Sequence, residues 1–243
     1  MPTTQTPTQR AAGALRHAVE VTTSTLPPLH PSGRPFVLGG IAATLTTRLF
    51  SRRLSTLAGL GTLATAAFFR EPTRVAPDND SIVTAPADGI VAGIDQAHPP
   101  VELGLAEQPR PRVSIFLSLF DVHVQRSPAS GVVRRVTYRP GRFFSADLDK
   151  ASEHNERSAM LLDTDTGHEL VTVQLAGLLA RRIVCHANTG DQLSTGDTYG
   201  LIRFGSRVDL YLPADARVLA RPGQRAVGGE TTLAEFPDPA GRV

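Results

Sequence analysis

A Gly-Ser pair opens a strongly patterned segment near the C-terminus. After Gly205 and Ser206, residues 207–212 alternate polar and apolar side chains, which is typical of a strand with one buried face. Glycine has no Cβ, so the Gly205 carbonyl is easier to reach, and its peptide easier to distort, than at other residue types. The Ser206 hydroxyl beside that carbonyl is a candidate nucleophile. Gly-Ser is also a common turn dipeptide, so an ordinary strand entry is the alternative.

Further motifs accompany this pair. In chain order they are Phe68-Phe69-Arg70-Glu71-Pro72, Thr84-Ala85-Pro86-Ala87-Asp88-Gly89, Phe120-Asp121-Val122-His123, Asp149-Lys150-Ala151-Ser152-Glu153-His154-Asn155-Glu156-Arg157 and Phe204-Gly205-Ser206. Together they resemble the phosphatidylserine decarboxylase proenzymes of the short bacterial type. The match runs from about Phe36 to the C-terminus, in order and without large gaps, which makes it specific.

The resemblance implies an enzyme that processes itself. The family cuts its own chain at the Gly-Ser bond, so cleavage would fall between Gly205 and Ser206 and would convert the serine into a pyruvoyl cofactor. The large chain, residues 1–205, and the small chain, residues 206–243, would stay associated because the strand after Ser206 belongs to the core. The pyruvoyl carbonyl would accept the amine of phosphatidylserine and the electrons released with carbon dioxide, which gives phosphatidylethanolamine.

The same resemblance assigns three catalytic residues. The family's Asp-His-Ser arrangement falls on Asp88, His123 and Ser206, with the acid orienting the imidazole and the imidazole removing the hydroxyl proton. Taken alone, Asp88 before Gly89 is an ordinary turn residue, and His123 after a strand is an ordinary interior or edge histidine. The connection to Ser206 is what favours a catalytic role for both.

Three more positions are candidate substrate contacts. Some family members carry a second histidine where this chain has Arg126, so either His123 serves both cleavage and decarboxylation or Arg126 holds the substrate's anionic groups. Lys150 and His154 fall in a family loop that could border the headgroup, although a solvated charged loop explains them equally well. No Cys/His spacing suggests zinc, and the Asp163–Gln174 segment fits a hairpin better than a calcium loop, so no metal is expected.

Composition narrows the chemistry and the partners. Lys150 is the only lysine among 25 basic residues, so cofactors that need a lysine have one candidate, and an electrophile made from the chain itself fits better. The net charge of +2 with a pI near 9.1 is too mildly basic to favour nucleic acid over an anionic membrane surface. The single cysteine, Cys185, excludes an internal disulfide and fits a reducing compartment.

The first 70 residues differ in character from the rest. Residues 1–35 are predicted to form a mobile leader without the features of a signal peptide. Two apolar segments follow, Phe36–Phe50 and Leu54–Phe69, and each is shorter than the about 20 residues that a spanning helix needs. We expect short helices that lie in or dip into the membrane interface, with two ordinary buried helices as the alternative.

Residues 71–243 are predicted to form a β-rich catalytic domain. The 21 glycines and 19 prolines favour turns over long helices, and the turns from Gly190 onward are regularly spaced. This spacing resembles the barrel-sandwich hybrid module of lipoyl and biotinyl carriers, without their lysine. A hairpin is expected over Ser158–Gln174, and the proline-rich segment His98–Arg112 is expected to be a loop. The predicted fold is therefore mainly β, with short membrane-associated helices at the N-terminus.

The sequence thus predicts a pyruvoyl-dependent decarboxylase of phosphatidylserine, peripheral on the cytoplasmic side of the cell membrane. Its partners would be the phospholipid substrate and the membrane surface, not nucleic acid, and a homo-oligomer is left open. Two alternatives remain: an uncleaved barrel-sandwich protein that binds a lipid or a partner without chemistry, and a decarboxylase of a different amine.

Overall fold

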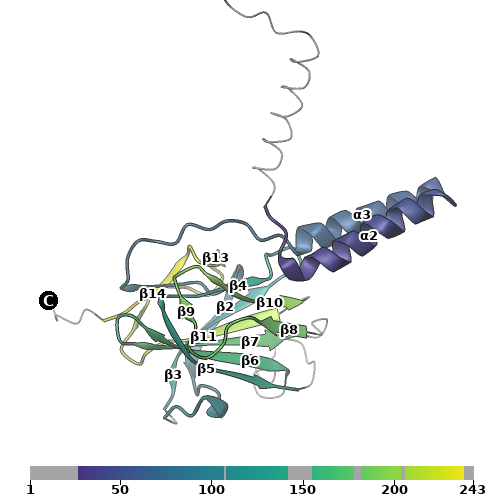
Figure 1. Ribbon diagram of the computed structural model, residues 1–243. Coiled ribbons are helices and arrows are strands. Elements are labelled where there is room, and N and C mark those ends of the chain that lie inside the picture. The colour runs from purple at the N-terminus through teal and green to yellow at the C-terminus, as the bar shows by residue number, and fades with distance from the viewer. Residues whose placement is uncertain (1–26, 107, 142–154, 178–181, 204–205, 238–243) are drawn as a thin grey trace, which may run out of the picture. The chain divides into compact units, whose positions relative to one another are not determined.

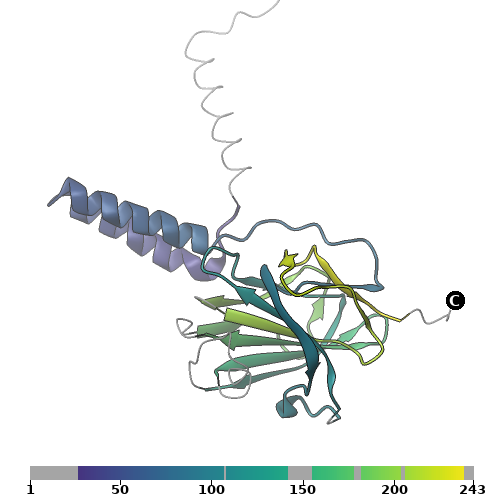
Figure 2. The same ribbon diagram turned by 180° about the vertical axis from the view of Figure 1, so that it is seen from behind.

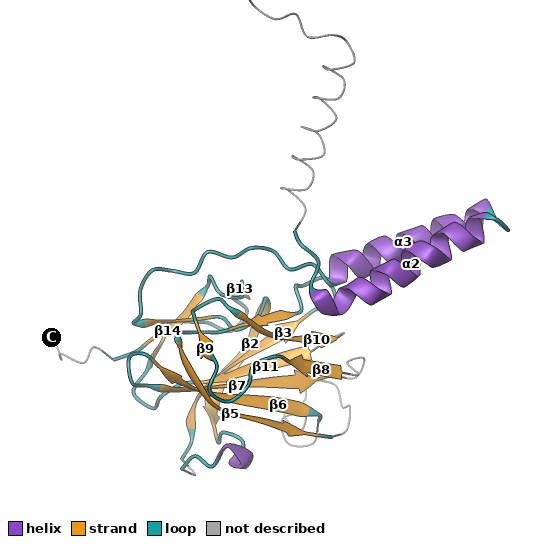
Figure 3. Cartoon of the chain, viewed as in Figure 1, coloured by secondary structure: helices purple, strands orange, loops and turns teal. Residues whose placement is uncertain are grey.

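The computed structural model describes residues 27–106, 108–141, 155–177, 182–203 and 206–237. Contacts within the chain divide it into two units, of which the first ends at Thr73 and the second begins at Arg74. The described part of the first unit is helical, and the second unit is built mainly from strands (Figure 3).

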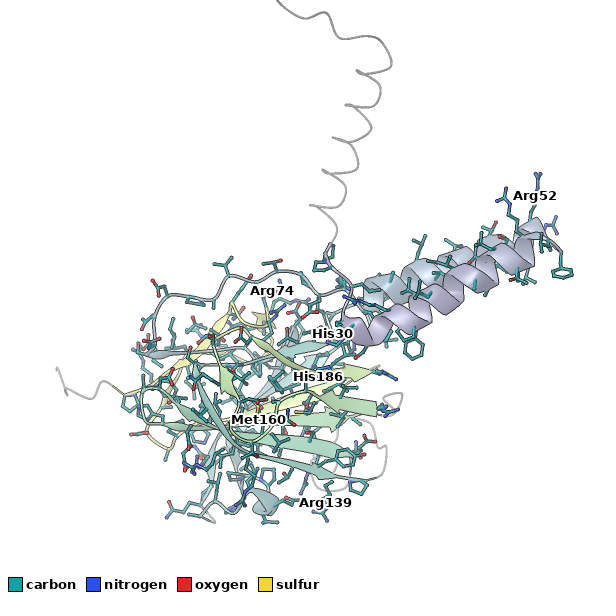
Figure 4. All side chains as sticks on the ribbon, in the orientation of Figure 1. His30, Arg52, Arg74, Arg139, Met160 and His186 are labelled. Carbon is teal, nitrogen blue, oxygen red and sulfur yellow. The ribbon has the colours of Figure 1, made fainter. Side chains whose placement is uncertain are left out.

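The first unit contains a helical hairpin. After the 3-10 turn η1 (Pro31–Gly33), helices α2 (Arg34–Arg48) and α3 (Arg52–Phe68) lie side by side, and Arg52 marks the end at which they are connected (Figure 4). Ser51 caps α3 through its side chain, which satisfies a backbone N–H that the helix itself cannot. Among the described residues, no helix has the length and apolar character needed to cross a membrane.

Small and hydroxylated residues form the seam between the two helices. A Cβ on Gly40 would come within 2.5 Å of the Thr62 hydroxyl, and the Ser55 hydroxyl donates to the Thr44 carbonyl at 2.9 Å. Large apolar side chains therefore point away from the seam. Ten of them are at least 45% exposed: Phe36, Leu38, Ile41, Leu45, Leu49, Phe50, Leu54, Leu57, Leu60 and Leu63.

The second unit is organised by one antiparallel sheet of eight strands, which is strongly curled in the two opposite views (Figures 1 and 2). Strand β11 is the fourth strand in the order below, between β3 and β7, so it is hydrogen-bonded on both sides. In spatial order the strands are β13 (Arg225–Ala226), β2 (Gly89–Ala97), β3 (Arg110–Leu117), β11 (Ser206–Tyr211), β7 (Glu169–Ala176), β6 (Arg157–Thr164), β5 (Gly131–Arg139) and β9 (Gln192–Leu193).

Two sheets of three strands complete the second unit. One has the order β4 (Val124–Arg126), β10 (Thr198–Arg203), β8 (Arg182–Cys185), and the other has the order β1 (Ile82–Thr84), β14 (Thr232–Glu235), β12 (Arg217–Val218). After β10 of the first of these sheets, the next strand along the chain is β11 of the large sheet.

The main core lies inside the curled sheet. Alternate residues of each strand enter it, as the period of two in a strand requires, and Met160 of β6 is one of them (Figure 4). The mainly β fold predicted from the sequence is confirmed, and the predicted hairpin is formed by β6 and β7. The prediction of a loop over His98–Arg112 was wrong for its last three residues, which belong to a strand. Strand β3 begins at Arg110, because pairing with β2 extends to Ala97 despite the prolines.

The other face of β11 carries a buried ion network. The Asp209 carboxylate accepts from the Ser114 hydroxyl at 2.7 Å and from Arg207 at 2.9 Å, and Arg112 lies 3.6 Å away. Asp209 and Tyr211 also line a cavity of about 640 Å³ on this face. The network ties β11 to β3 by charged groups that are shielded from water.

Replacing Asp209 with alanine is expected to reduce the free energy of unfolding by about 3–5 kcal/mol, because the buried Arg207 guanidinium would lose this carboxylate, whereas Arg112 keeps its pair with Asp95. Chemical denaturation measures this loss. The variant Asp209→Asn keeps the size and a hydrogen-bond acceptor, so its loss should be smaller. A loss below about 1 kcal/mol for the alanine variant would show that the network does not hold the strand.

Candidate active site

Ser206 is the first residue of β11, and its side chain is buried. It pairs with Leu117 of β3 and with Ala176 of β7, and its exposed fraction is 0%. Because side chains directly opposite each other share a face of the sheet, Ser206 faces the small apolar cluster to which Leu117 and Ala176 belong. Among the described residues, no group forms a hydrogen bond with its hydroxyl. Gly205 lies outside the described residues.

His123 lies near the end of the segment that connects β3 of the large sheet to β4 of a three-stranded sheet. Leu117, just before this segment, pairs with Ser206 of β11. Val124, just after it, pairs with Leu201 of β10. The His123 carbonyl accepts from the Ile202 amide at 3.1 Å, and the imidazole is fully buried. The topology therefore brings His123 to the end of the large sheet at which Ser206 begins β11.

The hydrogen bond of the His123 ring identifies its basic nitrogen. Nδ1 lies 2.9 Å from the backbone oxygen of Asp121. A carbonyl oxygen can only accept, so Nδ1 carries the proton in the neutral ring and Nε2 keeps its lone pair. This tautomer is suited to a general base that acts through Nε2.

A chain of buried amides fixes the backbone of His123. Gln125 donates through Nε2 to the His123 carbonyl at 2.9 Å, and Gln174 of β7 donates to the Gln125 side chain at 2.9 Å. All three side chains are buried, so each bond forms in a region of low dielectric constant. Sequence reasoning missed both glutamines, because a polar residue in a strand carries no signal of a partner 49 positions away.

Asp121 holds the turn that precedes His123. Its carboxylate accepts from the Ser118 amide and the Ser118 hydroxyl, both at 2.8 Å, and pairs with Arg225. Burial alone would raise the pKa of Asp121, but the bonds from Ser118 and Arg225 outweigh it and hold the pKa below its usual range. Asp121 therefore supplies the carbonyl for His123 and, through its side chain, the rigidity of the turn.

The lowered pKa of Asp121 predicts a pH-dependent contribution to stability. The ionised carboxylate stabilises the folded state above the unfolded-state pKa near ~4, and this contribution is lost as the pH falls through the lower folded-state value. The free energy of unfolding of the wild type should exceed that of Asp121→Asn by about 1–3 kcal/mol at neutral pH. Urea titrations should show this difference shrinking in acid. A difference that grows in acid would contradict the assignment.

Asp88 lies in the turn between β1 and β2, next to the strand that follows His123. The Pro86 carbonyl in this turn accepts from the Arg126 amide of β4 at 2.9 Å. The Asp88 carboxylate accepts from the Gly228 amide at 2.8 Å and pairs with Arg74 at 2.7 Å. Burial nevertheless raises the pKa of Asp88, because it outweighs the lowering by Gly228 and Arg74. Its assignment as the acid that orients His123 stays a prediction.

Gly228 is a third residue that sequence reasoning missed. A Cβ at this position would lie 3.2 Å from the Ala87 backbone and 3.3 Å from the Asp88 carboxylate, so a larger residue would crowd the turn. The pair Gly228-Gly229 indicated a turn in the sequence. Only the fold shows that this turn packs against Asp88, 140 positions earlier.

The remaining candidates are only partly placed. Arg126 is buried, and its guanidinium donates to the Gly196 carbonyl at 2.8 Å, so its role toward a substrate stays a prediction. Lys150 and His154 lie outside the described residues. Within the described part of the chain, no cluster of three or more His, Cys, Asp or Glu side chains is arranged to hold a metal ion.

Comparison with known proteins identifies relatives that match most of this chain. The family model described as phosphatidylserine decarboxylase matches residues 62–234. A phosphatidylserine decarboxylase proenzyme of Saccharopolyspora erythraea is 60% identical over 222 residues, which cover 91% of this chain and 94% of that protein. The proenzyme of Rhodococcus jostii is 54% identical over 238 residues, which cover 97% of each chain. That of Rhodococcus erythropolis is 57% identical over 224 residues, or 91% of this chain and 93% of that one.

Proposed function

Because this chain belongs to the phosphatidylserine decarboxylase family, a family of carboxy-lyases, we propose that it cuts itself between Gly205 and Ser206 and decarboxylates phosphatidylserine. The products are phosphatidylethanolamine and carbon dioxide, and the cofactor is a pyruvoyl group formed from Ser206. The observation that carries the proposal is the position of the buried Ser206 hydroxyl at the start of β11. The segment from β3 to β4 brings the buried His123 to the same end of the sheet.

Self-cleavage begins as an attack by the chain on its own backbone. His123 Nε2 takes the Ser206 hydroxyl proton while the oxygen bonds to the Gly205 carbonyl carbon and the amide nitrogen leaves as a protonated amine. An ester then joins Gly205 to the Ser206 side chain. Removal of the Cα proton of residue 206 expels the Gly205 carboxylate and leaves dehydroalanine, to which water adds as ammonia departs. The result is a pyruvoyl group at the start of the small chain.

The surroundings of residue 206 fit such a group. Apolar neighbours on both adjacent strands match a residue that has lost its hydroxyl and its amine, and the buried Ser206 hydroxyl has no hydrogen bond among the described residues that cleavage would have to break. The pairs from Ser206 to Tyr211 join β11 to β3 and β7, so the small chain would stay in the sheet after the cut. The Asp209 network adds bonds from residue 209 to Arg112 and Ser114 of the large chain.

During turnover the pyruvoyl carbonyl supplies the electrophile for the substrate amine and a sink for the electron pair left by carbon dioxide. The chain's own residues would do the rest. The apolar wall around residue 206 excludes water and disfavours the substrate carboxylate more than the neutral product, which favours loss of carbon dioxide. His123 Nε2 is the proposed donor of the proton to the carbon that the carboxylate leaves. Arg126 is the proposed contact for the anionic headgroup.

We also propose that the protein is peripheral on the cytoplasmic face of the cell membrane. Support comes from the α2–α3 hairpin, in which the leucines point away from the seam and the arginines Arg48, Arg52 and Arg53 gather at the connection. Apolar flanks with cationic ends suit the boundary between headgroups and acyl chains.

An assay of purified protein tests the function directly. Phosphatidylserine in mixed micelles should yield phosphatidylethanolamine and carbon dioxide in equal amounts, while free serine should yield neither. A ketone-reactive hydrazide should label the small fragment and block activity. Turnover of free serine but not of the lipid would assign a different amine substrate. The absence of any turnover and of any hydrazide label would favour an uncleaved binding protein.

A further inference from the structure

The turn between β3 and His123 exposes two large apolar side chains. The Asp121 amide donates to the Ser118 carbonyl at 3.0 Å, which closes a β-turn with Leu119 and Phe120 at its corners. Leu119 is 47% exposed and Phe120 is 87% exposed. Turn corners usually carry Gly, Pro, Asn, Asp or Ser, for conformational reasons. Leucine and phenylalanine at both corners add nothing to the turn itself, so their exposure requires another explanation.

This turn is held rigidly and lies beside the candidate active site. Both bonds from Ser118 to the Asp121 carboxylate run across its base, and Arg225 pairs with the same carboxylate. The preceding residue, Leu117, is the cross-strand partner of Ser206, and the His123 ring bonds the Asp121 carbonyl. The apolar corners therefore project from the same short segment that positions the proposed base.

Two arginines lie opposite each other at this edge. Arg203 ends β10 and pairs in register with Arg182, which begins β8. Like charges directly opposite are unfavourable in a sheet, and burial together with repulsion from Arg182 lowers the pKa of Arg203. An anion beside the two guanidinium groups would relieve this repulsion. Val122 lies between Phe120 and the start of β4, and β4 pairs with β10. The turn and the arginine pair therefore lie at the same end of these strands.

We propose that the Leu119–Phe120 turn inserts into the lipid surface, with Arg182 and Arg203 at the level of anionic headgroups, so that the end of the sheet at which Ser206 begins β11 faces the bilayer. The inference rests on the proposed lipid substrate. Apolar side chains and two cations at the same end of the strands match an anionic bilayer better than a protein partner or water. The phospholipid would then reach residue 206 without leaving the membrane for bulk solvent.

A single fluorophore tests the insertion. The chain has no tryptophan, so Phe120→Trp in the full-length protein introduces the only indole, at the corner of the turn. The matched control is Val132→Trp, because Val132 is 41% exposed and lies on β5, opposite Asp163 of β6. On vesicles of phosphatidylcholine and phosphatidylglycerol with brominated acyl chains, emission at position 120 should shift to the blue. Its quenching should be several-fold stronger than that at position 132.

Three outcomes would overturn the proposal. In the first, the protein binds vesicles but emission at position 120 is neither shifted nor quenched. In the second, the protein does not sediment with the vesicles. In the third, emission shifts to the blue without lipid, and the shift grows with protein concentration. The last would show that a second copy covers the turn.

A second variant separates this proposal from the proposed function. Replacing both Leu119 and Phe120 with serine should slow decarboxylation of phosphatidylserine in vesicles by about 10- to 100-fold. The variant would lose the favourable free energy of burying these two apolar side chains in the lipid. Turnover of a monomeric short-chain phosphatidylserine should stay unchanged. If the wild type fails on the monomeric lipid, the proposed function fails, whereas the quenching experiment still decides on insertion. Equal losses on both lipids would overturn the role of the turn.

Discussion

The variant Ser206→Ala is expected to remain one chain of 243 residues and to have no detectable decarboxylase activity. Alanine keeps the backbone of β11 and its pairs with β3 and β7, so the fold should persist. It removes the oxygen that attacks Gly205 and, with it, the source of the pyruvoyl group. A denaturing gel and a decarboxylation assay measure the two effects together.

A buried serine elsewhere in the same sheet provides the control. Ser158 of β6 is 4% exposed, and Ser158→Ala should be cut and active like the wild type. Ser206→Cys keeps a nucleophile at the position and should be cut, at a lower rate. Two fragments from Ser206→Ala would remove the basis of the proposed mechanism, because cleavage would then not require the Ser206 hydroxyl.

The variant His123→Ala should slow self-cleavage by about 10²–10⁴-fold, the usual contribution of a positioned general base. We expect this effect because the bond to the Asp121 carbonyl places the proton on Nδ1, which leaves Nε2 as the basic atom of a fully buried ring. The rate at which full-length precursor disappears after synthesis measures the effect. Any cleaved fraction should also turn over lipid more slowly, since the same nitrogen is proposed to return a proton to the substrate.

His186→Ala is the matched control for His123→Ala. His186 follows β8, which belongs to the same three-stranded sheet as β4, but its side chain is exposed, so its loss should leave processing unchanged. Added imidazole should partly restore cleavage to His123→Ala, which a merely misfolded variant would not show. Processing at the wild-type rate in His123→Ala would assign the base to another group.

The sequence predicted the local patterns of this fold better than the contacts that position the site. The alternation of residues 207–212 and the hairpin over Ser158–Gln174 are local signals, and both became strands of the large sheet. Strand β3 began inside a segment predicted as loop because its pairing with β2 is a tertiary contact that overrides four nearby prolines.

The supports of His123 illustrate why the rest could not be predicted. The Asp121 carbonyl acts through the backbone, which carries no sequence signal, and the chain from Gln174 through Gln125 joins strands of different sheets. The Gly228 amide bonds to Asp88, which lies 140 positions earlier in the sequence. The family resemblance supplied Asp88, His123 and Ser206 as a set, whereas the structure adds which neighbours hold each of them.

The mass of the purified wild-type protein tests the central claim most directly. The account predicts two polypeptides, residues 1–205 and residues 206–243. The smaller one should have a blocked amino end and should be lighter by one ammonia than a fragment that begins with serine. A folded and active preparation that consists of a single intact chain with an unmodified Ser206 would contradict it.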